Sequence, residues 1–399
     1  MRYPALSDAE LEGRRVFLRA DLNVPLENGK VADDTRIRGV VPTLRYLLGN
    51  GASVVIASHL GRPGGSRNPG LSLAPVADRL EDLMDMKVTF APDCIGARVS
   101  TLRSSMRPGD LLLLENLRFH PGEKEGDEQF ARQLADSADL YVNDAFGTSH
   151  RAHASMVGVP RILGGGYAGL LVERELEVFQ ERLESPERPF TLVLGGAKVS
   201  DKIPVIENLL TGLDRILIGG GMAFTFMLEL GLEVGNSLVE LDRLGAAGKI
   251  MEDARGRGIE VHLPRDIVVA PSTDRSDLSR TVPADSMPDG EMGLDIGSGT
   301  VEEFAGVICS SSTVVWNGPM GVFEIPPFDA GTRGIAEAMA TASDSGTFTV
   351  VGGGDSARAV AEAGLNDRLG FVSTGGGASL KLLQGDELPA LAALRGART

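Results

Sequence analysis

At 399 residues the chain is too long for one ordinary core, and roughly 100–200 residues per domain predicts two domains or three. Its hydrophobic share of 42% and charged share of 24% are typical of globular proteins. The net charge of −16 argues against nucleic acid or an anionic membrane as a general partner. No apolar run reaches the roughly 18 residues of a membrane span, and no signal-peptide core is present, so we expect a cytoplasmic protein without a membrane partner.

The two cysteines and the many glycines set further expectations. Cys94 and Cys309 lie far apart without metal-site spacing, so we expect each to be a small buried apolar residue of a reducing compartment. The 51 glycines come in clusters without a period. Such clusters mark turns, or places where the backbone approaches another group closely.

In the first half of the chain, short aliphatic runs alternate with longer amphipathic stretches. They predict strands at 16–20, 54–58, 111–115 and 140–143, with helices between them at 35–49 and 73–86. A charged helical run at 173–184 follows and is ended by the sequence SPERP at 185–189. We expect a solvated connecting helix there, between two domains.

The second half repeats the alternation. Strands are predicted at 191–195, 215–219, 313–316 and 347–351, and helices at 202–210, 331–342 and 356–363. Uniformly apolar strands that alternate with helices indicate parallel sheets covered on both faces, which is an α/β fold.

Basic side chains follow several strands of the first half. In open parallel sheets, ligands bind beyond the carboxyl ends of the strands. The residues placed there are Arg36, His59, Arg62, Arg118 and Arg151. Because arginine forks match phosphate and carboxylate oxygens, these residues predict one pocket for a small ligand that carries both groups. Asp21 and Asn23 are candidates to orient hydroxyl groups, or equally to shape the turn before Pro25.

Glycine-rich loops dominate the second half. Lys198 and Lys202 lie four residues apart at a strand-to-helix junction; if the helix begins between them, both ammonium groups project to one side and cradle a polyphosphate. The segment at 316–324 offers an apolar wall and one carboxylate. Asp355 lies at a helix entry, where it can hold Mg²⁺ directly or through water. The segment at 373–379 is a further helix-entry anion nest.

Seven segments together resemble the phosphoglycerate kinase family: RADLNVP (19–25), SHLGRP (58–63), ENLRF (115–119), LGGAKVSDK (194–202), WNGPMGVFE (316–324), GGGDS (352–356) and STGGGAS (373–379). They stand in the family's order and cover nearly the whole chain. The resemblance implies two Rossmann-like three-layer domains with parallel sheets, joined by a hinge helix. The expected boundaries are 1–172 with the tail 386–399 for the 3-phosphoglycerate domain, 173–188 for the connecting helix and 189–385 for the nucleotide domain.

The resemblance also implies reversible phosphoryl transfer from 1,3-bisphosphoglycerate to Mg·ADP, giving 3-phosphoglycerate and ATP, in a monomer. The residues implied to bind 3-phosphoglycerate are Asp21, Leu22, Asn23, Arg36, His59, Leu60, Gly61, Arg62, Arg118 and Arg151. Those implied to bind the nucleotide are Gly196, Ala197, Lys198, Lys202, Gly219, Gly220, Gly293, Leu294, Asn317, Val322, Glu324, Gly353, Gly354, Asp355 and Ser356. Asp355 is the implied metal residue, and Arg36, Lys198, Gly353 and Gly376 are the implied catalytic residues.

Two departures and two alternatives accompany this interpretation. Lys381 and Gln384 stand where the family usually has other residues, one of them acidic, which bears on domain closure rather than chemistry. A dinucleotide-dependent dehydrogenase would need a glycine fingerprint at an early strand, and the patterns at 164–169 and 352–357 lack its context. A non-catalytic phosphometabolite-binding relative should have lost Arg36, Lys198 or Asp355, and all three are present.

Overall fold

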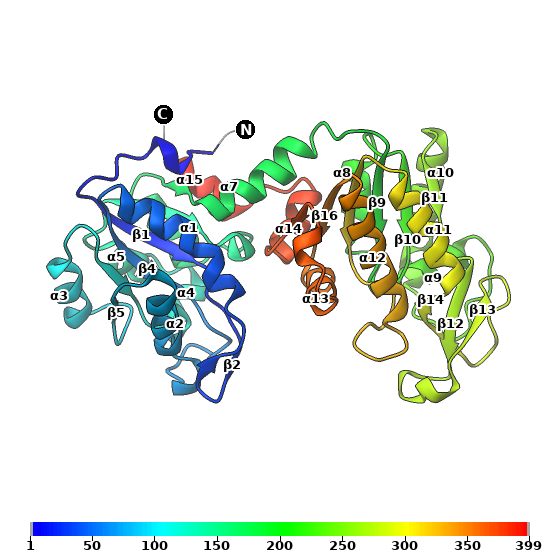
Figure 1. Cartoon of the computed structure of the whole chain (residues 1–399), viewed down its shortest axis with the longest axis horizontal. Helices are drawn as coiled ribbons and strands as arrows, with labels where there is room; N and C mark the ends of the chain where they lie inside the picture. Colours follow the sequence, from blue (N-terminus) through cyan, green and yellow to red (C-terminus); the bar gives the residue numbers. More distant parts are fainter. Residues whose placement is uncertain (1–2, 397–399) are drawn as a thin grey trace. The chain divides into compact units, whose positions relative to one another are not determined.

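The computed structural model describes residues 3–396, which form two compact units (Figure 1). Unit 1 runs through Glu177 and resumes at Glu387; unit 2 is Val178–Asp386. Each is built on its own parallel sheet between helices, so the predicted α/β class is confirmed.

Six parallel strands make the sheet of unit 1, in the order β5-β6-β4-β1-β7-β8. Their bounds are β1 Arg15–Ala20, β4 Ser53–Ala57, β5 Val88–Phe90, β6 Leu111–Leu113, β7 Leu140–Asp144 and β8 Tyr167–Ala168. Every residue of β4 and β6 is buried, as expected for strands covered on both faces. A small hairpin, β2 Leu26–Glu27 with β3 Lys30–Val31, lies outside this sheet.

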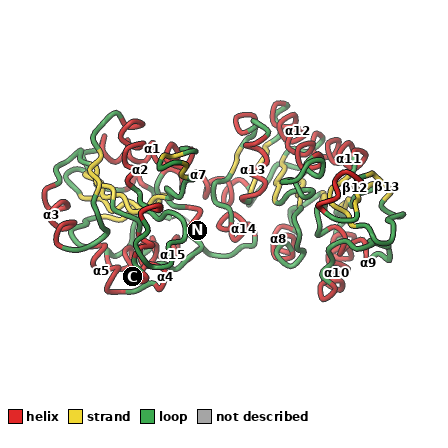
Figure 2. Tube along the Cα trace, turned by 90° about the horizontal axis from the view of Figure 1, so that it is seen from below, coloured by secondary structure: helices red, strands yellow, loops and turns green. Residues whose placement is uncertain are grey.

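Helices cover both faces of that sheet, with α1, α2 and α7 on one side and α4, α5 and α15 on the other (Figure 2). Their bounds are α1 Thr35–Gly49, α2 Ala74–Met84, α3 Ala97–Ser105, α4 Pro121–Glu125, α5 Glu128–Ala135, α6 Val159–Ile162, α7 Leu170–Leu176 and α15 Pro389–Leu394. One stripe of α1, including Ile37, Val40 and Leu44, packs on the strands in a continuous core. The helix predicted at 35–49 has the observed bounds of α1.

The sheet of unit 2 also has six parallel strands, in the order β11-β10-β9-β15-β16-β17. Its strands are β9 Phe190–Leu194, β10 Arg215–Ile218, β11 Glu260–His262, β15 Thr313–Asn317, β16 Phe348–Gly352 and β17 Phe371–Val372. The helices of this unit are α8 Ile203–Leu209, α9 Ala223–Glu229, α10 Leu244–Gly256, α11 Ser298–Cys309, α12 Ala330–Asp344, α13 Gly354–Glu362 and α14 Gly377–Leu383. Trp316 of β15 is fully buried in a core with Phe304 and Met339 of the covering helices.

An antiparallel sheet of three strands in unit 2 was not predicted. Its strands are β12 Asp266–Ala270, β13 Arg280–Pro283 and β14 Met292–Ile296, in the order β13-β12-β14. It packs a separate small core that includes Phe224 and Met227 of α9 with Ile267 and Val269 of β12.

Two expectations are wrong. The run at 173–184 is helical as expected, in α7 and the π-helical segment Glu177–Arg182 that follows it, but it is not solvated, because Phe179 and Leu183 are buried. Cys309 is exposed, although Cys94 is buried as expected. Within residues 3–396, no helix is both long enough and apolar enough to cross a membrane.

Candidate active-site halves in the two units

In unit 1, the predicted anion-binding residues lie beyond the carboxyl ends of the strands of the parallel sheet. Strand β1 lies between β4 and β7, and β6 lies beside β4. The loops that follow these four strands therefore leave the sheet side by side. They carry Asp21–Asn23, His59–Arg62, Arg118 and Arg151.

His59 lies at the centre of a group of positive charges. It is 5% exposed, and its Nδ1 lies 3.2 Å from Nη2 of the fully buried Arg19. Burial, together with the charges of Arg19, Arg118, Arg151 and Arg36, holds the pKa of His59 well below its usual value. The imidazole is therefore neutral at pH 7, and the guanidinium groups around it have the charge and geometry to bind a multiply charged anion.

Within the described residues, the hydrogen-bond donors of the buried Arg118 guanidinium are only partly satisfied. Its Nη1 donates to the carbonyl oxygen of Gly61 at 2.7 Å, while its Nε and Nη2 are buried without a hydrogen-bond partner among the described residues. Burial, then the nearby Arg151 and Arg19, lowers the pKa of Arg118 to about 10, so the group stays charged. A buried guanidinium with unsatisfied N–H groups is costly, and an anionic ligand would relieve that cost.

A buried hydrogen-bond network adjoins the arginines around His59, and sequence reasoning did not predict it. Arg19 Nε donates to Ser155 Oγ at 2.9 Å, and Ser155 Oγ donates to the fully buried Glu123 at 2.6 Å. Burial would raise the pKa of Glu123, but the nearby His153, with its Nδ1 3.7 Å away, the charge of Arg19 and the hydrogen bonds from Ser155 hold it below its usual value. Glu123 is thus an internal counter-ion for Arg19; nothing in its sequence neighbourhood signals that role.

The remaining predicted residues shape the rim of this group. Arg36 Nη1 donates to Asp21 Oδ2 at 3.0 Å, and the Arg36 side chain is 39% exposed. The backbone N–H of Gly61 donates to Asn23 Oδ1 at 2.8 Å, which ties the loop after β1 to the loop after β4. Arg62 is exposed, whereas Leu22 and Leu60 are buried and support the loops.

A separate hollow of unit 1, of about 670 Å³, is not this site. Its charged walls carry four carboxylates, of Asp33, Asp34, Asp78 and Asp82, and two basic groups, of Lys30 and Arg79. The excess of negative charge disfavours an anionic substrate there.

Unit 2 contains a cavity of about 400 Å³ at the carboxyl ends of its strands. Eight predicted nucleotide residues line it, namely Gly196, Ala197, Gly220, Gly293, Leu294, Val322, Glu324 and Asp355. Met320, from the segment predicted to offer an apolar wall, also lines it, and Phe224 and Leu238 add apolar surface that sequence reasoning did not identify. A half-enclosed apolar slot with a carboxylate at its mouth suits a planar heterocycle that bears a hydroxylated sugar.

Glycine is required at the wall of this cavity. A Cβ on Gly293 would meet Phe224 Cζ at 2.1 Å, and one on Gly219 would meet Met320 Sδ at 2.5 Å. Gly220 has φ +64°, and a Cβ there would meet the backbone nitrogen of Gly196 at 2.6 Å. Side chains at these positions would fill the slot or push its walls apart.

Asp295 is a buried carboxyl group in the cavity wall that was not predicted. It is 3% exposed, and its oxygens accept from the N–H groups of Gly331 at 2.6 Å and Ile296 at 2.9 Å. Burial raises its pKa to about 8 despite these hydrogen bonds. Asp295 is therefore mostly protonated at pH 7 and does not repel an anion in the cavity.

The two lysines differ more than expected. Helix α8 begins at Ile203, after both of them, so the condition that the helix begins between them is not met. Lys202 is 9% exposed, its Nζ donates to Asn317 Oδ1, and burial lowers its pKa to about 8, offset in part by Asp201 and Asp355. Lys198 is exposed.

The helix-entry glycines have the predicted local structure. Gly353 (φ +93°) and Gly376 (φ +51°) are the N-cap residues of α13 and α14, so backbone N–H groups face outward there. Asp355 is exposed in the first turn of α13 beside Gly354. Ser356 Oγ accepts from the N–H of Gly318 at 2.7 Å and links the loops after β15 and β16.

These features define an α/β protein with a basic anion site on one parallel sheet and a nucleotide-sized cavity on another. A family model described as phosphoglycerate kinase matches residues 6–386. The chain belongs to the phosphoglycerate kinase family.

Relatives cover almost the whole chain. A cytosolic phosphoglycerate kinase of Triticum aestivum is 50% identical over 98% of this chain and 97% of its own. A chloroplastic phosphoglycerate kinase of Volvox carteri is 50% identical over 98% of this chain and 85% of its own. The solved structure of phosphoglycerate kinase from Coxiella burnetii has a TM-score of 0.87 and 38% identity, covering 98% of this chain and 99% of that one.

Proposed function

We propose that this chain transfers a phosphoryl group reversibly between 1,3-bisphosphoglycerate and Mg·ADP, giving 3-phosphoglycerate and ATP. Family membership and the full-length relatives support the reaction. The observation on this chain that carries the assignment is the buried, partly unpartnered Arg118 among further arginines around a neutral His59. That group matches a ligand with a phosphate at one end and a carboxylate at the other.

The two ligands divide between the units in this proposal. 3-Phosphoglycerate binds to unit 1, where Arg62, Arg118, Arg151 and His59 hold its charged groups, and Asp21 and Asn23 orient its hydroxyl group. The nucleotide binds to unit 2, with its base against the apolar walls of the cavity and its ribose at Glu324. Asn317 Nδ2, buried and without a partner among the described residues, is a donor available to the phosphates.

Transfer needs positioning and charge neutralisation more than acid–base chemistry. The acceptor is a carboxylate or a nucleotide phosphate, which is ionised at pH 7, so no general base is required. In the proposed mechanism Arg36, Lys198 and the N–H groups of Gly353 and Gly376 surround the migrating group. Their interactions accelerate the reaction to the extent that they strengthen as charge redistributes in the transition state.

Asp355 fits the proposed metal role, because an exposed carboxylate in a glycine-rich helix entry is an oxygen ligand of the kind that Mg²⁺ prefers. When bound, Mg²⁺ supplies positive charge to the nucleotide phosphates. We further propose that the protein works as a cytoplasmic monomer, supported by the cytosolic wheat relative; the Volvox relative is chloroplastic.

Calorimetry on two variants tests the division of ligands. Arg118→Ala should weaken 3-phosphoglycerate binding about 10- to 100-fold, because a charge-assisted contact is lost, and leave Mg·ADP binding unchanged. Gly293→Ala should weaken Mg·ADP binding and spare 3-phosphoglycerate. Gly245→Ala is the matched control, since a Cβ there meets nothing within 4 Å. Loss of both ligands in either variant that folds as well as wild type would contradict the division.

A further inference from the structure

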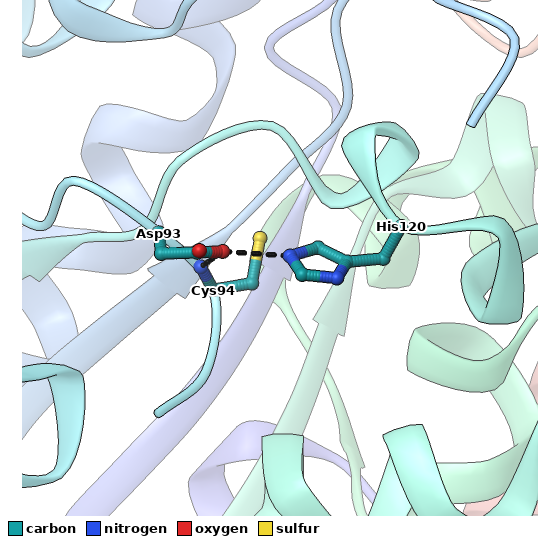
Figure 3. Close-up of side chains that lie close together, drawn as sticks. All are labelled: Asp93, Cys94 and His120. Atoms are coloured by element: carbon teal, nitrogen blue, oxygen red, sulfur yellow. Dashed lines mark hydrogen bonds and ion pairs between the residues drawn. The ribbon is translucent and has the colours of Figure 1, made fainter. Parts of the chain in front are cut away.

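Asp93, Cys94 and His120 form a cluster in unit 1 that the proposed reaction does not use (Figure 3). One carboxylate oxygen, one sulfur and one imidazole nitrogen lie within 4.8 Å of one another. His120 Nε2 lies 2.6 Å from Asp93 Oδ1. Within residues 3–396 this is the one group of three such side chains that close together. Sequence spacing did not reveal it, because Asp93 and Cys94 follow β5 whereas His120 follows β6.

The ligand set has a definite chemical preference. A thiolate, an imidazole and a carboxylate together favour Zn²⁺ over the hard cations Mg²⁺ and Ca²⁺. Bond lengths of about 2.0–2.3 Å to a tetrahedral ion place ligand atoms roughly 3.5 Å apart. The Asp93 and His120 ligand atoms, now 2.6 Å apart, would separate by about 1 Å to admit an ion, with water as the fourth ligand.

Two of the three side chains in the cluster reach solvent. Cys94 is fully buried, but the side chain of Asp93 is 48% exposed and that of His120 is 26% exposed. The His120 ring stacks on Phe130 with centroids 5.0 Å apart, which limits its reorientation. Two accessible ligands can capture the ion first, and the sulfur can then complete the site from the interior.

The charges around the sulfur favour a cation. The charged side chains around the buried sulfur are the carboxyl groups of Asp93, Glu115 and Glu123, opposed by Arg103. The Cys94 thiol donates to the carbonyl oxygen of Glu115 at 2.9 Å. The same negative surroundings that disfavour a thiolate alone stabilise a divalent cation beside it.

We propose that Asp93, Cys94 and His120 form a Zn²⁺-binding site. On binding, the Cys94 S–H bond and the Asp93–His120 hydrogen bond break, a metal–sulfur bond forms, and the thiol proton passes to solvent. The site holds the 115–120 segment against the segment after β5. The 115–120 segment carries Arg118. Bound Zn²⁺ would therefore restrain the loop that positions Arg118 in the anion site.

Metal titration of the nucleotide-free full chain tests the proposal. Zn²⁺ should bind with one-to-one stoichiometry in calorimetry and raise the melting temperature. Cd²⁺ should give an ultraviolet thiolate-to-metal charge-transfer band. Cys94→Ser should abolish the band, and His120→Asn, which keeps the thiol, should weaken Zn²⁺ binding at least about tenfold.

Cys309→Ser is the matched control, because it removes the exposed thiol of unit 2 and should leave both signals unchanged. A band that disappears in Cys309→Ser but persists in Cys94→Ser would overturn the proposal. So would wild-type Zn²⁺ affinity in His120→Asn, or the absence of any Zn²⁺ binding to the wild-type chain. Circular dichroism of each variant before titration verifies the fold.

Discussion

Arg36 differs from the other arginines of the anion site in its freedom to move. Its side chain is 39% exposed and donates to Asp21, whereas Arg19 and Arg118 are buried. We expect Arg36→Ala to lower kcat about 100- to 1,000-fold while changing nucleotide affinity little, because the proposed contact is made with the migrating group. Arg38→Ala is the control: Arg38 lies on the same helix, is 60% exposed and pairs only with Asp34 among the described residues. A kcat near normal in Arg36→Ala would contradict the role.

Asp355 is an exposed carboxylate in the first turn of α13. Asp355→Asn should weaken Mg·ADP binding and spare 3-phosphoglycerate, because an amide oxygen is a poorer Mg²⁺ ligand than a carboxylate. Calorimetry of both ligands measures this, with the exposed Asp253→Asn on α10 as the control. Unchanged Mg·ADP affinity would count against the metal role.

Lys198 and Lys202 should give separable phenotypes. Lys198 is exposed, so it can follow the migrating group, and Lys198→Ala should lower kcat by about 100-fold or more. Lys202 is buried against Asn317, where the charge of a phosphate would change little during transfer, so Lys202→Ala should raise nucleotide KM about 10- to 100-fold. Steady-state kinetics decides this, with Lys249→Ala on the exposed face of α10 as the control. Equal kcat losses, or the reverse pattern, would show that the roles are wrongly assigned.

Sequence reasoning proposed site residues only where they stand in polar strand-end loops or at helix entries. It missed Glu123, Ser155 and Asp295, whose importance comes from burial. Glu123 matters because folding places it behind Arg19, and Asp295 because folding buries it against the start of α12. Neither environment is encoded in adjacent residues.

Among the elements of unit 2, Asp295 links the cavity wall to the first turn of α12 by a hydrogen bond. Its Oδ2 accepts from the N–H of Gly331 in the first turn of α12, and a Cβ on Gly321 would meet its Oδ1 at 2.3 Å. The carboxyl group thus lies between the loop after β15 and the start of α12. Ionisation there would place an unpaired charge in the interior.

This coupling predicts a pH dependence of stability. The pKa of Asp295 is raised to about 8 in the fold, so the folded chain keeps a proton that the unfolded chain has lost. The stabilisation is complete below about pH 4 and is lost as pH rises through about 8, with a slope of at most about 1.4 kcal/mol per pH unit. Asp295→Asn should flatten the fall in melting temperature between pH 6 and pH 9, whereas Asp253→Asn should not. Identical pH profiles for wild type and Asp295→Asn would contradict this account.

The helices and strands with a clear apolar pattern in the sequence were predicted best. Eight strands of the two parallel sheets are runs of apolar residues, and their positions were predicted within about two residues. The edge strands β5, β8, β11 and β17 have only two or three residues each and were not predicted. The antiparallel sheet was missed because β12 alternates buried and half-buried residues and β13 is mostly exposed, a pattern that resembles a loop. The π-helical segment after α7 was missed because its charged residues hide the buried Val178 and Phe179.

At the scale of the whole molecule, the charge around the anion site is opposite in sign to the net charge of the chain. The chain has a net charge of −16, yet the arginines around His59 lie at one sheet edge. A local positive field inside an acidic protein selects small, highly charged anions over nucleic acid. The proposed reaction also requires water to be excluded from the transferring group, because water would hydrolyse an acyl phosphate.

The central claim is phosphoryl transfer between a nucleotide and phosphoglycerate. The most direct measurement is the transfer of label from γ-labelled ATP to 3-phosphoglycerate by the purified wild-type chain, with Mg²⁺ and with a chelator. We expect label in the acyl phosphate of 1,3-bisphosphoglycerate with Mg²⁺, loss of transfer with the chelator, and no dependence on a dinucleotide. Binding of both ligands without any transfer of label would identify a non-catalytic relative and contradict the account.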